Sequence, residues 1–95
     1  MHQRLKGQTA IITGGAQGLG AALAQRLDQE GCNVVVADIN LEAAEKIAAS
    51  LTSGAALQVD VSNEEQVEKM VDFASSKFGS LDLLVSNEPN LEEAK

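Results

Sequence analysis

The stretch Thr13–Gly20, TGGAQGLG, decides how the rest of this 95-residue chain is organised. The four residues before it, TAII at 9–12, form an apolar run that predicts a strand. The leucines after it recur every fourth residue over 19–27, a spacing that predicts one face of a helix. The sequence therefore predicts a glycine turn between a strand and a helix.

Glycines at 14, 18 and 20 make this turn suitable for binding a ligand. Glycine tolerates positive φ and has no Cβ, so the backbone can turn tightly and approach a ligand closely. The helix that follows directs unpaired N–H groups and the positive end of its dipole at the same place, where a pyrophosphate would fit. The alternative is that the glycines only make a tight turn. The strand before, the helix after and an acid downstream favour a dinucleotide site.

Strands and helices alternate along the rest of the chain. Asn40 is expected to cap the second helix, and Ser62 and Glu65 have the spacing of a capping box that opens the third. The predicted elements are strands at 33–38, 55–59 and 81–85 and helices at 41–51 and 62–78.

This alternation predicts an α/β fold with parallel strands joined by right-handed crossovers. We expect a Rossmann-like, truncated doubly wound sheet of four strands in the order 3-2-1-4, with three crossover helices. The first two helices should cover one face and the third the other. The glycine turn would lie where the strand order reverses, which is where such folds bind ligands.

Asp38 ends the second strand twenty residues after Gly18, where a carboxylate can accept both hydroxyls of an adenosine ribose. A 2′-phosphate about 4 Å away would be opposed by about 4 kcal/mol at an effective dielectric of about 20. No cation offsets this, because position 17 is glutamine and position 39 is isoleucine. The sequence therefore predicts NAD in preference to NADP. The alternative is that Asp38 is only a polar strand end.

Asp60 and Val61 follow the third strand on the same rim. The carboxylate could accept the adenine amino group, and the Val61 N–H could meet a ring nitrogen. Asp60 also precedes a helix, so a role in helix electrostatics is equally open.

Composition excludes several kinds of partner. A net charge of −7 and a pI near 4.5, with scattered basic residues, argue against nucleic acid. No apolar run approaches the roughly 20 residues that would span a bilayer, so no membrane insertion is expected. A lone Cys32 and a polar N-terminus lead us to expect a reducing, cytoplasmic setting.

The other potentially reactive side chains are expected to have no chemical role. The acids of the third helix, at 64, 65, 68 and 72, are expected to form a solvated face rather than an acid–base pair. Cys32 is expected to be a small buried side chain, because no histidine accompanies it. His2 has no second ligand nearby, so we predict that it is exposed to solvent and that the chain has no metal site. None of these side chains is expected to be catalytic.

With these features in order, the chain resembles the short-chain dehydrogenase/reductase family over residues 5–87. The family's TGxxxGxG pattern is met by Thr13, Gly14, Gly18 and Gly20. The stretch LLVSN at 83–87, at the end of the predicted fourth strand, is also similar to the family. An acid ending the second strand is similar to the NAD-linked hydroxyacyl-CoA and hydroxysteroid dehydrogenases.

The resemblance implies a role for each residue of the cofactor site. Beyond the glycines, it places Gln17 and Leu19 along the pyrophosphate, and Asp38 and Ile39 along the adenosine ribose. It places Asp60 and Val61 at the adenine and Asn87 on the side of the inner ribose.

The chain departs from the family after Asn87, where Glu88 and Pro89 replace an alanine and a glycine. It also contains no tyrosine, and the family's proton-transfer group is the tyrosine of a Tyr-x-x-x-Lys pair. We therefore expect a single truncated domain over 1–95, with a divergent tail at 88–95 and no turnover by the chain alone. An exposed fourth strand predicts self-association, a complementing C-terminal fragment or marginal stability.

Three functions stay open from the sequence. The leading one is the NAD-binding half of a short-chain oxidoreductase that interconverts an alcohol and a carbonyl. The second is a non-catalytic nucleotide-binding or regulatory module, and the third is a scaffold that binds nothing.

Overall fold

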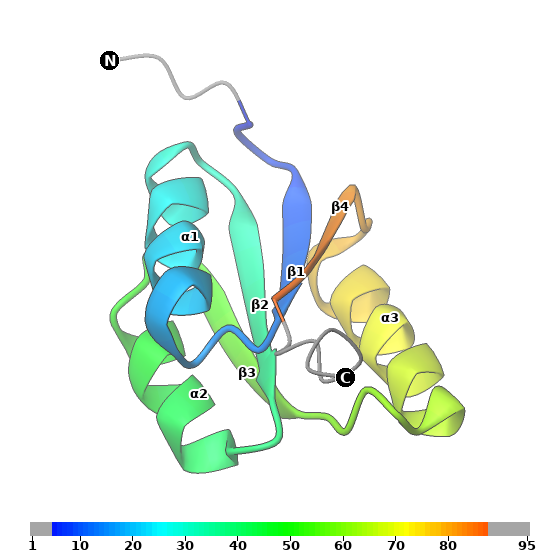
Figure 1. The fold of residues 1–95 in the computed structure, drawn as a ribbon. Coiled ribbons are helices and arrows are strands. Elements are labelled where there is room, and N and C mark those ends of the chain that lie inside the picture. The colour runs from blue at the N-terminus through cyan, green and yellow to red at the C-terminus, as the bar shows by residue number, and fades with distance from the viewer. Residues whose placement is uncertain (1–4, 88–95) are drawn as a thin grey trace.

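A computed structural model describes residues 5–87 as one α/β unit with alternating strands and helices (Figure 1). The elements, in chain order, are β1 (Thr9–Thr13), α1 (Gly18–Gln29), β2 (Asn33–Asp38), α2 (Leu41–Ala49), β3 (Gly54–Gln58), α3 (Glu64–Phe78) and β4 (Leu83–Ser86).

All four strands are parallel and lie in the order β3-β2-β1-β4, which confirms the predicted topology. In the centre of the sheet Ile11 lies opposite Val35 on one side and Leu84 on the other. The strand order reverses beside β1, so the carboxyl end of β1 is the switch point of the sheet.

Helices cover both faces of the sheet, as predicted. In Figure 1, α1 and α2 lie on one side of the strands and α3 on the other. The core under α1 and α2 is built from Ala10, Ile12, Ala24, Leu27, Cys32, Val34, Val36 and Ala44. The core under α3 is built from Ile11, Val35, Ala37, Val59, Met70 and Ala74.

The two central strands and the outer strand β4 differ in burial. Every residue of β1 is buried, whereas Leu83 and Leu84 of β4 are 39% and 52% exposed. The fourth strand is therefore an edge, as the sequence predicts, and part of its apolar surface is uncovered.

Several predicted boundaries were wrong by one or two residues. The structure ends α2 at Ala49, starts β3 at Gly54 and starts β4 at Leu83. The predicted capping box at the start of α3 was also wrong. Asn63 is the N-cap, because its side chain accepts from the Gln66 N–H, while Ser62 donates its N–H and hydroxyl to the Asp60 carboxylate.

The predicted helix face over 19–27 was partly wrong as well. Leu27 is buried and Leu23 is half-buried, but Leu19 is 79% exposed. Leu19 lies in the first turn of α1 and lines the cavity over the glycine loop instead of the core.

Polar side chains at the amino end of the sheet are paired with one another. The Ser53 hydroxyl donates to Asn33 at 2.7 Å, Asn33 donates to the Thr9 hydroxyl at 3.3 Å, and the Thr9 N–H donates to the Asp82 carboxylate at 2.9 Å. These hydrogen bonds link the residue before β3, the first residues of β2 and β1, and the residue before β4.

No helix within residues 5–87 combines the length and the apolar character needed to cross a membrane. The predicted divergent tail at 88–95, including Glu88 and Pro89, lies outside the described residues.

Candidate functional site

The glycine turn leaves β1 and enters α1 with backbone geometry that glycine makes possible. Gly18 has a φ of +45°, in the left-handed region. A Cβ on Gly20 would collide with the Gly14 carbonyl oxygen and would lie 2.7 Å from the Asn87 amide nitrogen. Glycine at position 20 therefore lets the first turn of α1 lie directly against the loop.

The start of α1 is left open by the protein itself. Gln17 occupies the N-cap, but its side chain makes no capping hydrogen bond, and the first turn contains no acid. The first hydrogen bond of the helix runs from the Ala21 N–H to the Gln17 carbonyl, so the three preceding amides lie ahead of it. These amides and the helix dipole favour an anion at this position.

The other described helices begin differently. Asn40 caps α2 by accepting from the Ala43 N–H, and Asn63 caps α3 in the same way. Both helices also carry glutamate in the first turn. The open start of α1 is thus a local feature of this loop.

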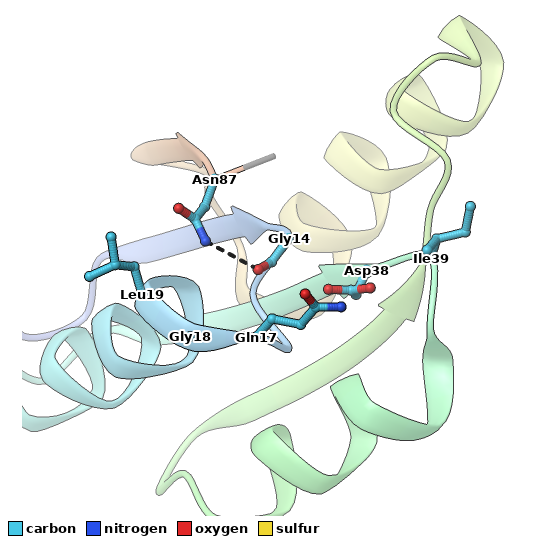
Figure 2. A pocket seen from close by; sticks show the side chains of 7 residues that line it. All are labelled: Gly14, Gln17, Gly18, Leu19, Asp38, Ile39 and Asn87. Carbon is cyan, nitrogen blue, oxygen red and sulfur yellow. Dashed lines mark hydrogen bonds between the residues drawn. The ribbon is translucent and has the colours of Figure 1, made fainter. Parts of the chain in front are cut away.

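A cavity of about 500 Å³ lies over the open helix start, a size within the range of small-molecule sites. Figure 2 shows the Gln17 side chain extending toward Asp38, with Leu19 and Asn87 on the other side of the loop. The cavity is lined by Gly14, Gln17, Gly18, Leu19, Asp38, Ile39 and Asn87, all of them residues that the sequence had placed in the cofactor site.

Asp38 is almost fully buried at the rim of this cavity, with 5% of its surface exposed. One carboxylate oxygen accepts from the Ala16 N–H at 3.2 Å, and the other accepts from the Asn40 N–H at 2.9 Å. A buried carboxylate needs such partners. Each oxygen can accept a further hydrogen bond, so the group can still receive two hydroxyls.

Asn87 lies at the opposite side of the loop, directly after β4. Its N–H donates to the Thr13 carbonyl at 3.0 Å, and its side-chain amide donates to the Gly14 carbonyl at 3.4 Å (Figure 2). The loop is therefore held from the β2 side and from the β4 side.

Three predicted site residues do not line this cavity. Gly20 contributes by close packing, as described above. Asp60 is half-buried, and hydrogen bonds from the Ser62 hydroxyl and N–H lower the pKa of its carboxyl group. Val61 is 41% exposed and lines a separate hollow with residues of α3 and β4. Contacts of Asp60 and Val61 with adenine stay predictions.

The sequence analysis missed Gly15 and Ala16. A Cβ on Gly15 would lie 2.9 Å from the Ile12 carbonyl oxygen and 3.1 Å from a Val36 methyl carbon, so this glycine also packs tightly. Its place in the glycine run could have signalled this. Ala16 contributes a backbone N–H, which no residue type reveals.

The remaining reactive groups lie elsewhere. Cys32 is buried, and desolvation, together with the nearby charges of Asp82, Glu30 and Asp28, raises the pKa of its thiol. Its predicted role as a small buried side chain is confirmed. Within residues 5–87 no cluster of histidine, cysteine and acidic side chains could hold a metal ion.

Comparison with known proteins agrees with this geometry. The family model described as short chain dehydrogenase matches residues 8–89. The chain belongs to the short chain dehydrogenase family.

Individual family members are similar over nearly the whole chain. Sorbitol dehydrogenase from Cereibacter sphaeroides is 44% identical over 85 residues, which cover 88% of this chain and 33% of that protein. An uncharacterized oxidoreductase from Mycobacterium bovis is 44% identical over 91 residues, which cover 92% of this chain and 36% of that protein.

Solved structures of family members have the same fold. A hydroxysteroid dehydrogenase from Escherichia coli matches with a TM-score of 0.88 and 36% identity, over 93% of this chain and 39% of its own. A 3-ketoacyl-(acyl-carrier-protein) reductase from Brucella melitensis, solved in complex with NADH, matches with a TM-score of 0.81 and 37% identity, over 84% of this chain and 33% of its own. The chain thus spans between a third and two fifths of the family members it matches.

Proposed function

We propose that this chain binds NAD(H), with the pyrophosphate over the glycine loop and the adenosine ribose on Asp38. The observation that carries the proposal is the open start of α1, which faces a cavity whose rim holds a buried carboxylate. Amide donors suit a pyrophosphate, and a carboxylate suits a ribose diol. Family membership supports a nicotinamide cofactor, and one structural relative is described as a complex with NADH.

The preference for NAD over NADP rests on charge. A 2′-phosphate about 4 Å from the Asp38 carboxylate would cost about 4 kcal/mol, or about a thousandfold in affinity. Among the described residues that line the cavity, none is lysine or arginine. Gln17 and Ile39 stand where a cation could otherwise offset that repulsion.

The other predicted contacts complete the cofactor site. Gln17 and Leu19 would flank the pyrophosphate, and Ile39 would lie against the adenosine. Asn87 would lie beside the inner ribose, since it borders the same cavity from the β4 side. Asp60 and Val61 would reach the adenine from the end of β3.

The reaction that this site would serve is the interconversion of an alcohol and a carbonyl by hydride transfer. The printed names of the relatives, sorbitol dehydrogenase and hydroxysteroid dehydrogenase among them, support this class. The 95 residues contain no tyrosine, so a proton-transfer group of the family's type must come from outside them. That observation favours a second candidate for the chain alone, a nucleotide-binding module without turnover.

The uncovered surface of β4 supports a macromolecular partner. Leu83 and Leu84 are partly exposed on an edge strand, and edge strands with apolar side chains promote association. We propose that this edge is covered by a second copy of the chain or by a complementing C-terminal fragment. A cytoplasmic location stays a prediction from the single cysteine.

Titration calorimetry of the chain with NAD, NADP and AMP tests the proposal. We expect saturable binding of NAD and AMP, with NADP at least about a hundredfold weaker than NAD. Equal affinities for NAD and NADP would reject the role of Asp38, and no binding of any nucleotide would reject the site.

A matched pair of glycine variants tests whether the loop is the binding element. Gly18 and Gly79 both have positive φ, and a Cβ on either meets nothing within 4 Å. Gly18→Val and Gly79→Val should therefore lower stability to a similar degree, but only Gly18→Val should weaken NAD binding. An unchanged response to NAD in Gly18→Val would support a scaffold that binds nothing at this loop.

A further inference from the structure

The carboxylate of Asp38 is part of the glycine loop's own support. The Ala16 N–H in the loop donates to one of its oxygens at 3.2 Å, and the Asn40 N–H donates to the other at 2.9 Å. With 5% of its surface exposed, Asp38 is enclosed between the loop and the start of α2.

We propose that Asp38 is a positioning residue for the pyrophosphate loop, in addition to its proposed role as the acceptor of the ribose hydroxyls. It fixes the direction of the Ala16 peptide and thereby the path of the loop into α1. The proposal rests on the proposed function, because it concerns the same cofactor site.

The contacts of the loop show why this one bond matters. Consecutive loop residues are each tied to a neighbouring strand: Gly14 through its carbonyl to Asn87 at 3.4 Å, Gly15 through its N–H to the Ala37 carbonyl at 3.3 Å, and Ala16 to Asp38. The first two bonds join neutral groups. The bond to Asp38 has an ionised acceptor, and bonds to charged groups are about twice as strong as neutral ones.

Of these three hydrogen bonds, the one from the Ala16 N–H lies nearest to the open start of α1. It is followed by Gln17, the N-cap of α1, and then by Gly18 with its positive φ. Loss of the Ala16 bond would free the loop directly ahead of the amides that face the pyrophosphate. Affinity for pyrophosphate would then fall although Asp38 does not touch it.

Electrostatics alone predicts the opposite result. Removing a negative charge from the rim of the cavity would strengthen the binding of a free anion. Pyrophosphate has no ribose, so the direction in which its affinity changes when the charge of Asp38 is removed distinguishes the two roles. Weaker binding indicates that Asp38 positions the loop, and unchanged or tighter binding indicates that it acts only on the ribose.

The test compares the full chain with Asp38→Asn, and uses Glu42→Gln as the control. Asparagine keeps the shape of the side chain but cannot accept from both amides, because one of its terminal groups is a donor. Glu42 is exposed in the first turn of α2, so its variant removes one charge without touching the loop. Binding of inorganic pyrophosphate is measured by calorimetry, and exchange of the Ala16 amide hydrogen is measured by NMR.

We expect Asp38→Asn to bind pyrophosphate about fivefold more weakly and to exchange the Ala16 hydrogen at least about tenfold faster than the wild type. Glu42→Gln should change neither quantity in that direction. Unchanged or tighter pyrophosphate binding in Asp38→Asn, with loss confined to NAD, would overturn the proposal.

The wild-type chain provides a second measurement that needs no variant. Among residues 5–87 no hydrogen-bond acceptor is assigned to the Gln17 N–H, so the Ala16 hydrogen should exchange more slowly than that of Gln17. Equal exchange rates would overturn the proposal. If the wild type binds neither pyrophosphate nor NAD, the proposed function fails, and the two exchange measurements alone decide whether Asp38 holds the loop.

Discussion

The starts of α1 and α3 are built from opposite chemistry. At α3, Asn63 caps the helix and Glu64 and Glu65 lie in the first turn, so the protein supplies its own negative charge to the exposed amides. At α1 the N-cap side chain makes no hydrogen bond and the first turn has no acid. The proposed cofactor site rests on this difference, because a helix start without internal partners favours an external anion, whereas a capped start already has a partner.

Gly20→Ala should have the largest effect on stability and NAD affinity, because it disrupts the close packing of α1 on its loop. A Cβ at Gly20 would collide with the Gly14 carbonyl oxygen. We expect the free energy of unfolding to fall by about 2 kcal/mol. We also expect NAD affinity to fall about a hundredfold, because displaced amides lose their hydrogen bonds to the pyrophosphate.

Gly54→Ala is the control for crowding alone. A Cβ at Gly54 would lie 2.9 Å from the Ala48 carbonyl oxygen, far along the chain from the loop. Urea unfolding should show a loss of stability in both variants, whereas calorimetry should show a loss of NAD affinity only in Gly20→Ala. Equal NAD affinity in the two variants would contradict the account.

Gln17→Asp converts the start of α1 into one like that of α3. An aspartate at the N-cap should raise the free energy of unfolding by about 1 kcal/mol. Its charge would occupy the position proposed for the pyrophosphate, so NAD affinity should fall about tenfold or more. Gln17→Asn should cap the helix without the charge and weaken NAD binding much less. Stronger or unchanged NAD binding in Gln17→Asp, measured by calorimetry, would show that the anion lies elsewhere.

Asn63→Ala makes the reverse change at α3. Loss of its hydrogen bond to the Gln66 N–H should lower the free energy of unfolding by about 1 kcal/mol. NAD affinity should not change, because Asn63 does not line the cavity over the glycine loop. A fall in NAD affinity without a matching fall in stability would place part of the cofactor site at α3.

The pH dependence of stability gives the smallest effect. Hydrogen bonds from Ser62 lower the pKa of Asp60 below its ordinary value of 3.8, so the folded chain favours the ionised carboxylate. This contribution to stability is present above the ordinary pKa and is lost as the pH falls through the lower pKa of the folded state.

Ser62→Ala removes the larger of the two causes, so its stability should decline less than that of the wild type between about pH 5 and about pH 3. Urea unfolding at both pH values measures the difference. An identical decline in the two proteins would contradict the role of these hydrogen bonds.

The sequence was sufficient for the topology and for naming the residues that line the cavity. Strand-like and helix-like patterns are local, and the TGGAQGLG stretch combines glycine chemistry with a position at the switch point. The charge of Asp38 and its spacing from Gly18 were enough to place both at one cavity.

The predictions that were wrong or incomplete depend on contacts in the folded chain that residue types alone do not reveal. Ser62 had the spacing of a cap, but the Asp60 carboxylate takes its hydrogen bonds and leaves the cap to Asn63. Leu19 fitted the helical period, but it lines the cavity over the glycine loop and is exposed. The Ala16 N–H was missed because every residue except proline has one, and only the folded path of the loop brings it to Asp38.

NMR titration of the isotope-labelled chain with NAD shows whether the open start of α1 receives the pyrophosphate, because it reports each backbone amide separately. We expect saturable shifts that are largest at Gly18, Leu19 and Gly20, with smaller shifts at Asp38 and none at residues 64–66. Saturable binding with the largest shifts at residues 64–66, or no shift at Gly18–Gly20 at saturating NAD, would contradict this expectation.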